Sequence, residues 1–149
     1  MSVHLRPIVR GNFVAVLELQ LHKNEVMLLS PNAVSIAMAY AIPGYELRGI
    51  YLDERLVGFI MWGKVEHLPD FWISRLMIDR QHRRKGYAEG AMKSVMEELS
   101  MKPDFNQLFL SFEPENTVAS KLYEKLGFED TGKVDPDGEL IYVWKPTLD

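Results

Sequence analysis

Residues 79–92 read DRQHRRKGYAEGAM and place four cationic side chains within residues 80–85, directly before a glycine and the start of a helical pattern. The first turn of a helix presents unpaired backbone amides, and the helix dipole favours negative charge at that end. Gly86 allows a ligand to approach the backbone closely, and Ala88 keeps the first turn narrow. The segment therefore predicts a phosphate-binding site, with a solvated basic loop as the alternative.

Other motifs that would compete with this interpretation are missing. The chain has neither a G-x-x-x-x-G-K-[ST] segment for a nucleoside triphosphate nor a G-x-G-x-x-G segment for a dinucleotide. Its four histidines never fall at a metal-ligand spacing, and it has no cysteine. We therefore predict no metal site.

A second motif begins about 30 residues beyond Gly86. Residues 116–128 read NTVASKLYEKLGF and match the pattern N-x-x-A-x-x-x-Y-x-x-x-G-F. With both motifs in this order, the chain resembles the GNAT superfamily of acyl-CoA-dependent N-acyltransferases over nearly its whole length. The resemblance implies an α/β fold, in which a mixed central sheet is flanked by helices and splays into a cofactor wedge. It also implies acetyl-CoA as cosubstrate. The length of 149 residues and the apolar content of 47% predict one domain over residues 1–149.

The resemblance assigns roles to individual residues. In such enzymes the glycine loop wraps the pyrophosphate of coenzyme A, and the preceding strand end pairs with the pantetheine arm as with an added strand. Asn116 would contact the pantetheine, and Tyr123 would face the sulfur; their purely structural roles would be a helix cap and a core aromatic. The implied cofactor-binding residues are Leu76, Met77, Ile78, Arg83, Arg84, Lys85, Gly86, Tyr87, Ala88 and Asn116.

The chemistry that the resemblance implies is direct attack of an amine on the acetyl thioester, with an oxyanion near the Ile78 amide and a departing thiolate. A phenol can protonate a thiolate of broadly similar basicity, so we expect Tyr123 to be the general acid. Many relatives have a glutamate that acts as the general base on the strand where this chain has Ser74 and Arg75. The general base therefore stays open among Glu113, Glu66, His67 and Asp70.

Strands and helices alternate along the chain, as in an α/β protein. Apolar residues at intervals of three and four predict the clearest helix over residues 86–99, and a strand is expected over residues 72–78. One face of that strand is expected to carry Trp72, Ser74, Leu76 and Ile78. Further strands are expected over residues 3–8, 47–52, 56–63, 108–112, 128–134 and 140–144, and further helices over residues 12–21, 30–40 and 119–126.

Charge and a second resemblance narrow the choice of acceptor. The net charge of −4 argues against a nucleic-acid binder, and residues 113–139 hold eight acidic and three basic side chains, which suits a cationic ligand or a solvated acidic face. Residues 22–63 look like the corresponding region of bacterial spermidine/spermine N-acetyltransferases, which implies a polyamine acceptor. The side chains available to contact it are Glu25, Glu46, Asp70, Glu113, Tyr40, Trp62 and Trp72.

Several alternatives remain at this point. A protein or aminoglycoside N-acetyltransferase is the nearest rival, and a non-catalytic acyl-CoA sensor is a second. The chain has no apolar run of about 18 residues, so we expect no membrane span, and the lack of cysteine suits the reducing cytoplasm. The sequence leaves the oligomeric state open, a homodimer included.

Overall fold

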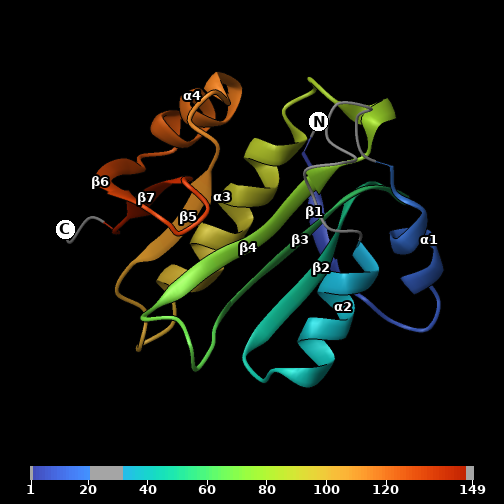
Figure 1. Ribbon diagram of the computed structural model, residues 1–149. Helices are drawn as coiled ribbons and strands as arrows, with labels where there is room; N and C mark the ends of the chain where they lie inside the picture. Colours follow the sequence, from blue (N-terminus) through green and yellow to red (C-terminus); the bar gives the residue numbers. More distant parts are fainter. Residues whose placement is uncertain (1, 21–31, 147–149) are drawn as a thin grey trace.

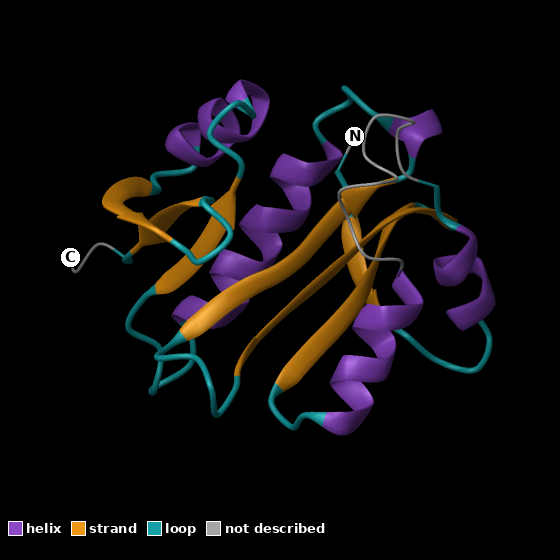
Figure 2. Ribbon diagram, viewed as in Figure 1, coloured by secondary structure: helices purple, strands orange, loops and turns teal. Residues whose placement is uncertain are grey.

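The structure, a computed structural model, describes residues 2–20 and 32–146. Seven strands form one mixed sheet in the order β1-β2-β3-β4-β5-β7-β6, with helices on both faces (Figures 1 and 2). The strands are β1 (His4–Pro7), β2 (Tyr45–Leu52), β3 (Arg55–Lys64), β4 (Phe71–Ile78), β5 (Leu108–Phe112), β6 (Glu129–Val134) and β7 (Leu140–Trp144). The helices are α1 (Phe13–Glu18), α2 (Asn32–Ala41), η1 (Arg80–His82), α3 (Tyr87–Ser100) and α4 (Thr117–Lys125).

This architecture confirms the α/β fold expected from the sequence, and the element boundaries agree to within a few residues. The expected start of the second helix, at Ser30 and Pro31, lies outside the described residues. No helix in the described ranges is long and apolar enough to cross a membrane.

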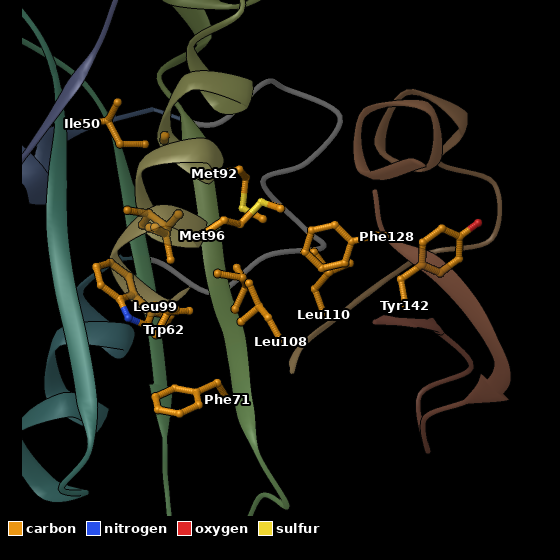
Figure 3. Close-up of a cluster of buried hydrophobic side chains, with 14 of the residues drawn as sticks. Ile50, Trp62, Phe71, Met92, Met96, Leu99, Leu108, Leu110, Phe128 and Tyr142 are labelled. Carbon is orange, nitrogen blue, oxygen red and sulfur yellow. The ribbon is translucent and has the colours of Figure 1, made fainter. Parts of the chain in front are cut away.

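The central strand β3 is buried on both faces of the sheet. Alternate residues of β3 face opposite ways: Ile60 and Trp62 pack against α3, whereas Phe59 and Met61 pack against Val16 of α1. The apolar stripe of α3 lies on the first of these faces, together with the buried residues of β5 (Figure 3). The helix periodicity of residues 86–99 thus marks the side chains that form the larger core.

The parallel strands β4 and β5 separate soon after they meet. Within these two fully described strands, pairing is limited to Phe71 with Leu108 and Trp72 with Phe109. Beyond that point β5 continues to pair with β7, while β4 continues to pair with β3. The sheet therefore opens, toward the carboxyl ends of both strands, into the wedge that the family resemblance implied.

A bulge in β4 reverses the faces of its side chains. Met61 pairs with Arg75 and Trp62 with Ile73, so Ser74 is an extra residue in β4. Because Ile73 and Leu76 both belong to the core against α3, Ser74 and Arg75 both face the opposite side. The prediction that Trp72 shares a face with Leu76 is therefore wrong: Trp72 lies on the side away from α3, and the inserted residue breaks the two-residue period.

Candidate active site

The glycine loop joins the end of β4 to the start of α3. Two of its residues, Arg84 (φ 63°) and Gly86 (φ 80°), have left-handed backbone conformations. Gly86 is the N-cap residue of α3, and no side chain caps this end of the helix. A Cβ atom built on Gly86 would meet nothing within 4 Å, so the approach to the first-turn amides is open. These features fit the diphosphate of coenzyme A.

The three basic residues of this loop, Arg83, Arg84 and Lys85, differ in exposure. Arg84 and Lys85 are exposed, as expected for residues that attract a phosphate. Arg83 is partly buried, and its Nε donates a hydrogen bond of 3.0 Å to the carbonyl oxygen of Ile78. Arg83 therefore fastens the loop to the end of β4, a role that the sequence did not indicate.

The end of β4 presents backbone groups to the wedge. Leu76, Met77 and Ile78 lie beyond the last pairing with β5, so the β5-facing edge of this segment has no strand partner among the described residues. Met77 and Ile78 are buried on opposite faces of the sheet, and Leu76 is half-buried. An unpaired edge between two buried faces can accept an extended ligand as an additional strand.

Helix α4 borders the same wedge and carries the second motif. Asn116 is exposed at its N-terminus, and its Oδ1 accepts a hydrogen bond of 3.0 Å from the amide of Ala119. The ring of Tyr123 lies 5.6 Å from that of Phe112 and 5.8 Å from that of Phe128. The cap and the packed aromatic are both present, so each residue has a structural role whatever its part in catalysis.

Burial raises the pKa of Tyr123 to about 12. The phenol is therefore fully protonated at neutral pH, which a proton donor requires. A second phenol, Tyr142 of β7, donates a hydrogen bond of 2.8 Å to Oε2 of Glu124, and this bond raises the pKa of Tyr142 to about 12. The hydroxyl of Tyr142 is thus engaged by a carboxylate, which makes Tyr142 the less suitable proton donor of the two.

An ion-pair network ties α4 to the start of α3. Glu89, in the first turn of α3, lies 2.9 Å from Nζ of Lys125 and 3.1 Å from Nζ of Lys93. The hydrogen bond from Lys125, with that from Lys93, lowers the pKa of Glu89. Two lysines thus balance the negative charge of Glu89, the one acidic side chain in the helix turn that follows the glycine loop.

The four candidate bases lie at opposite ends of the parallel strands β4 and β5. Glu113 directly follows the carboxyl end of β5, where the wedge opens. Asp70 directly precedes β4, and its Oδ1 accepts a hydrogen bond from the amide of Phe71. Because a strand of this length spans roughly 26 Å, Asp70 is far from the glycine loop, as are Glu66 and His67 in the preceding turn. The structure brings only Glu113 of the four to the wedge.

The candidate acceptor contacts are also dispersed. Trp62 is 1% exposed and packs into the core on the α3 side, so it is unavailable to a ligand. Glu46 lies on β2, where its Oε2 pairs with Arg48 at 3.0 Å, and Tyr40 is almost fully exposed on α2. Trp72 lies at the closed end of the wedge, where it pairs with Phe109, and Glu25 lies outside the described residues.

Sequence reasoning missed one buried polar contact beside the wedge. Arg75 is 8% exposed, and its Nε and Nη2 lie 3.3 and 3.2 Å from Oδ1 of Asn32 on α2. The Asn32 amide in turn donates a hydrogen bond to the carbonyl oxygen of Val16 on α1. Arg75 thus occupies the region of β4 expected to carry a base, and it helps to dock both helices.

Comparison with known proteins agrees with this geometry. Residues 17–128 match the model of the acetyltransferase (GNAT) family. The spermine/spermidine N(1)-acetyltransferase of Bacillus subtilis (strain 168) is 26% identical over 149 residues, covering 96% of this chain and 98% of that protein.

Among solved structures, the spermidine N-acetyltransferase of Vibrio cholerae in complex with CoA and spermine is 15% identical, with a TM-score of 0.73 and coverage of 97% of this chain and 95% of that one. The aminoglycoside acetyltransferase AAC(6')-Ib in complex with coenzyme A is 19% identical, with a TM-score of 0.78 and the same two coverages. At these identities the likeness shows the fold alone.

The glycine loop before α3 and the wedge between β4 and β5 define an acyl-CoA-dependent N-acyltransferase. The chain belongs to the GNAT acetyltransferase family. It is therefore an enzyme that uses acetyl-CoA to acetylate an amine. Within the described ranges, no group of three histidine, aspartate or glutamate side chains is placed to hold a metal ion.

Proposed function

We propose that the acceptor is a polyamine of the spermidine or spermine class. The observation that carries the proposal is the full-length similarity to the Bacillus subtilis enzyme, whose name specifies spermine and spermidine. The acidic excess of residues 113–139 supports it, because a negative field attracts a multiply charged cation. The absence of cysteine suits a reducing compartment, and we place the reaction in the cytoplasm.

We further propose how the residues at the wedge divide the reaction. Acetyl-CoA supplies the activated thioester when bound. The amides of residues 86–88 and the side chains of Arg84 and Lys85 hold its diphosphate, and the free edge of residues 76–78 orients its pantetheine arm. Asn116 contacts that arm from α4.

Tyr123 supplies the proton that the leaving sulfur requires. As the amine nitrogen bonds to the acetyl carbon, the carbon–sulfur bond breaks and the sulfur takes the phenolic proton of Tyr123. A proton from the same nitrogen then restores the phenol. One more proton must leave before attack, because the acceptor is an ammonium ion that reacts only as the free amine. A base on the acceptor side must take that proton.

The test is a comparison of kcat/KM for spermine, spermidine, a short monoamine, a lysine peptide and an aminoglycoside in one buffer. We expect both polyamines to exceed the monoamine and the peptide, because a shorter amine leaves the carboxylates for the distal ammonium groups unpaired. Added salt should reduce that preference where exposed charge supplies it. A monoamine or peptide that matches both polyamines would refute the polyamine assignment and leave the acetyltransferase activity intact.

The fold provides a specific reason to include the aminoglycoside. The aminoglycoside acetyltransferase superposes on this chain with a TM-score of 0.78, as well as the spermidine enzyme does at 0.73. Architecture therefore does not discriminate between the two acceptors. An aminoglycoside with the highest kcat/KM would replace the polyamine as the assigned substrate.

A further inference from the structure

Strand β5 has a second face that the core does not use. Leu108, Leu110 and Phe112 are buried against α3 and its neighbours, so Phe109 and Ser111 point to the opposite side of the sheet. On that side, α1 and α2 pack over β2 and β3. The second face of β5 therefore lies on the side of the sheet opposite α3.

A carboxylate from the β6–β7 turn is fixed on this face. Oγ of Ser111 donates a hydrogen bond of 2.9 Å to Oε1 of Glu139, which is partly buried. The backbone of Glu139 is held as well: its amide donates to Oδ1 of Asp135, and its carbonyl oxygen accepts from the amide of Asp135, both at 2.9 Å. Glu139 Oε2 makes no hydrogen bond within the described part of the chain. This oxygen is available to a ligand.

An aromatic pair lies farther along the same face. The rings of Trp72 and Phe109 stack with centroids 5.2 Å apart, where β4 and β5 last pair. Phe109 and Ser111 are two residues apart on β5, or about 7 Å along the strand. An aliphatic polyamine matches this arrangement, because a carboxylate can hold one ammonium group while the rings contact the neighbouring methylene and ammonium groups.

Tyr123 and Glu139 lie on opposite sides of the end of β5. Tyr123 packs on Phe112, which faces α3, whereas the neighbouring Ser111 faces the other way and holds Glu139. In direct acyl transfer, the nucleophile approaches the carbonyl carbon from one side of the thioester, and the acid that protonates the sulfur lies on a different side. An amine that enters beside Glu139 would meet a thioester whose sulfur lies toward Tyr123.

We infer that Glu139, positioned by Ser111, binds the reacting ammonium group of the acceptor and takes its proton before attack. The inference rests on the proposed acetyltransferase reaction and identifies the base that the sequence left open. The ammonium N–H bond breaks, its proton passes to the Glu139 carboxylate, and the electron pair stays on nitrogen as the nucleophile. The carboxylic acid then releases that proton to solvent, which restores Glu139.

The experiment compares four variants of the full-length enzyme. Glu139→Gln removes the charge and keeps the shape of the side chain, and Ser111→Ala removes the contact that positions it. Asp137→Asn is the matched control, because it removes one negative charge from the same turn at an exposed residue. Glu113→Gln tests the rival carboxylate at this edge of the sheet. For each variant, kcat and KM for spermidine are measured at pH 7 and pH 10, with acetyl-CoA affinity measured by calorimetry.

We expect kcat/KM of Glu139→Gln to fall about 100-fold at pH 7, that of Ser111→Ala about tenfold, and that of Asp137→Asn less than threefold. Acetyl-CoA affinity should change less than threefold in all of them. The Glu139→Gln defect should shrink at pH 10, where much of the free amine is already neutral, since alkylammonium groups have a pKa of about 10.4. A merely structural role would give the same defect at both pH values.

Three results would overturn the inference: a Glu139→Gln enzyme within threefold of wild type, a defect of equal size at both pH values, or a large loss in Glu113→Gln with none in Glu139→Gln. If the unmodified enzyme acetylates no amine, the proposed function itself fails. That outcome is distinct, because it appears before any variant is compared.

Discussion

Gly86 offers the sharpest test of the cofactor loop, because the chain provides a matched control for it. Gly86 and Gly132 both have φ of 80°, both are exposed, and a Cβ atom on either would meet nothing within 4 Å. Any L-residue at either position therefore carries a similar backbone strain, about 1–2 kcal/mol, without a steric clash. Gly132 lies on β6, away from the loop. A glutamate substitution at each position separates the cost to stability from the effect on the cofactor.

The Gly86→Glu substitution would place a negative charge beside the diphosphate. At about 4 Å, two unit charges repel by about 1 kcal/mol in water and by about 4 kcal/mol at an effective dielectric constant of about 20. These energies correspond to losses of acetyl-CoA affinity from about fivefold to several hundredfold, and we expect at least about tenfold for Gly86→Glu. Gly132→Glu should leave the affinity unchanged. Isothermal titration calorimetry measures both, and thermal unfolding confirms that both variants are folded.

Two further measurements complete the test. Gly86→Ala carries the backbone strain without the charge, so its affinity should lie between those of wild type and Gly86→Glu. Higher salt should recover part of the Gly86→Glu loss, because it screens charge and leaves strain unaffected. Unchanged affinity in folded Gly86→Glu, or an equal loss in Gly132→Glu, would refute the assignment of the diphosphate to this loop.

The remaining predictions concern α4 and the two buried phenols. Tyr123→Phe should lower turnover by about 100-fold or more with little change in acetyl-CoA affinity, and turnover within threefold of wild type would reduce Tyr123 to a packing residue. Asn116→Ala should lower the free energy of unfolding in urea by about 1 kcal/mol, because it removes the cap on the Ala119 amide; an unchanged midpoint would contradict this. The pKa values of Tyr123 and Tyr142 are raised to about 12, above the value near 10 of an unfolded tyrosine, so the neutral phenols stabilise the fold fully below pH 10. That contribution to the free energy of unfolding should be lost as the pH rises through about 12. In urea unfolding from pH 8 to pH 11, the free energy of unfolding of Tyr142→Phe should therefore decrease less than that of the wild type.

The glycine loop, the helix that follows it and the Asn116 cap could be predicted because their signals are local. A helix start, a glycine before it and an Asn cap each depend on a few consecutive residues. The same holds for the apolar stripe of α3, whose periodicity marked the core correctly. Most of the fold follows from such signals in sequence, since each element is recognisable before it is packed.

The acceptor side could not be predicted in this way, because its contacts join residues that are distant in the chain. Glu139 meets Ser111 across 28 positions, and Arg75 meets Asn32 across 43. These pairs depend on strand register, and one extra residue at Ser74 is enough to move Trp72 to the other face. Local patterns along the chain were enough to predict the elements and to mark the two motifs. The contact of Glu139 with Ser111 could be known only from the packed sheet, because register is set by the packing of the whole sheet and not by any one segment.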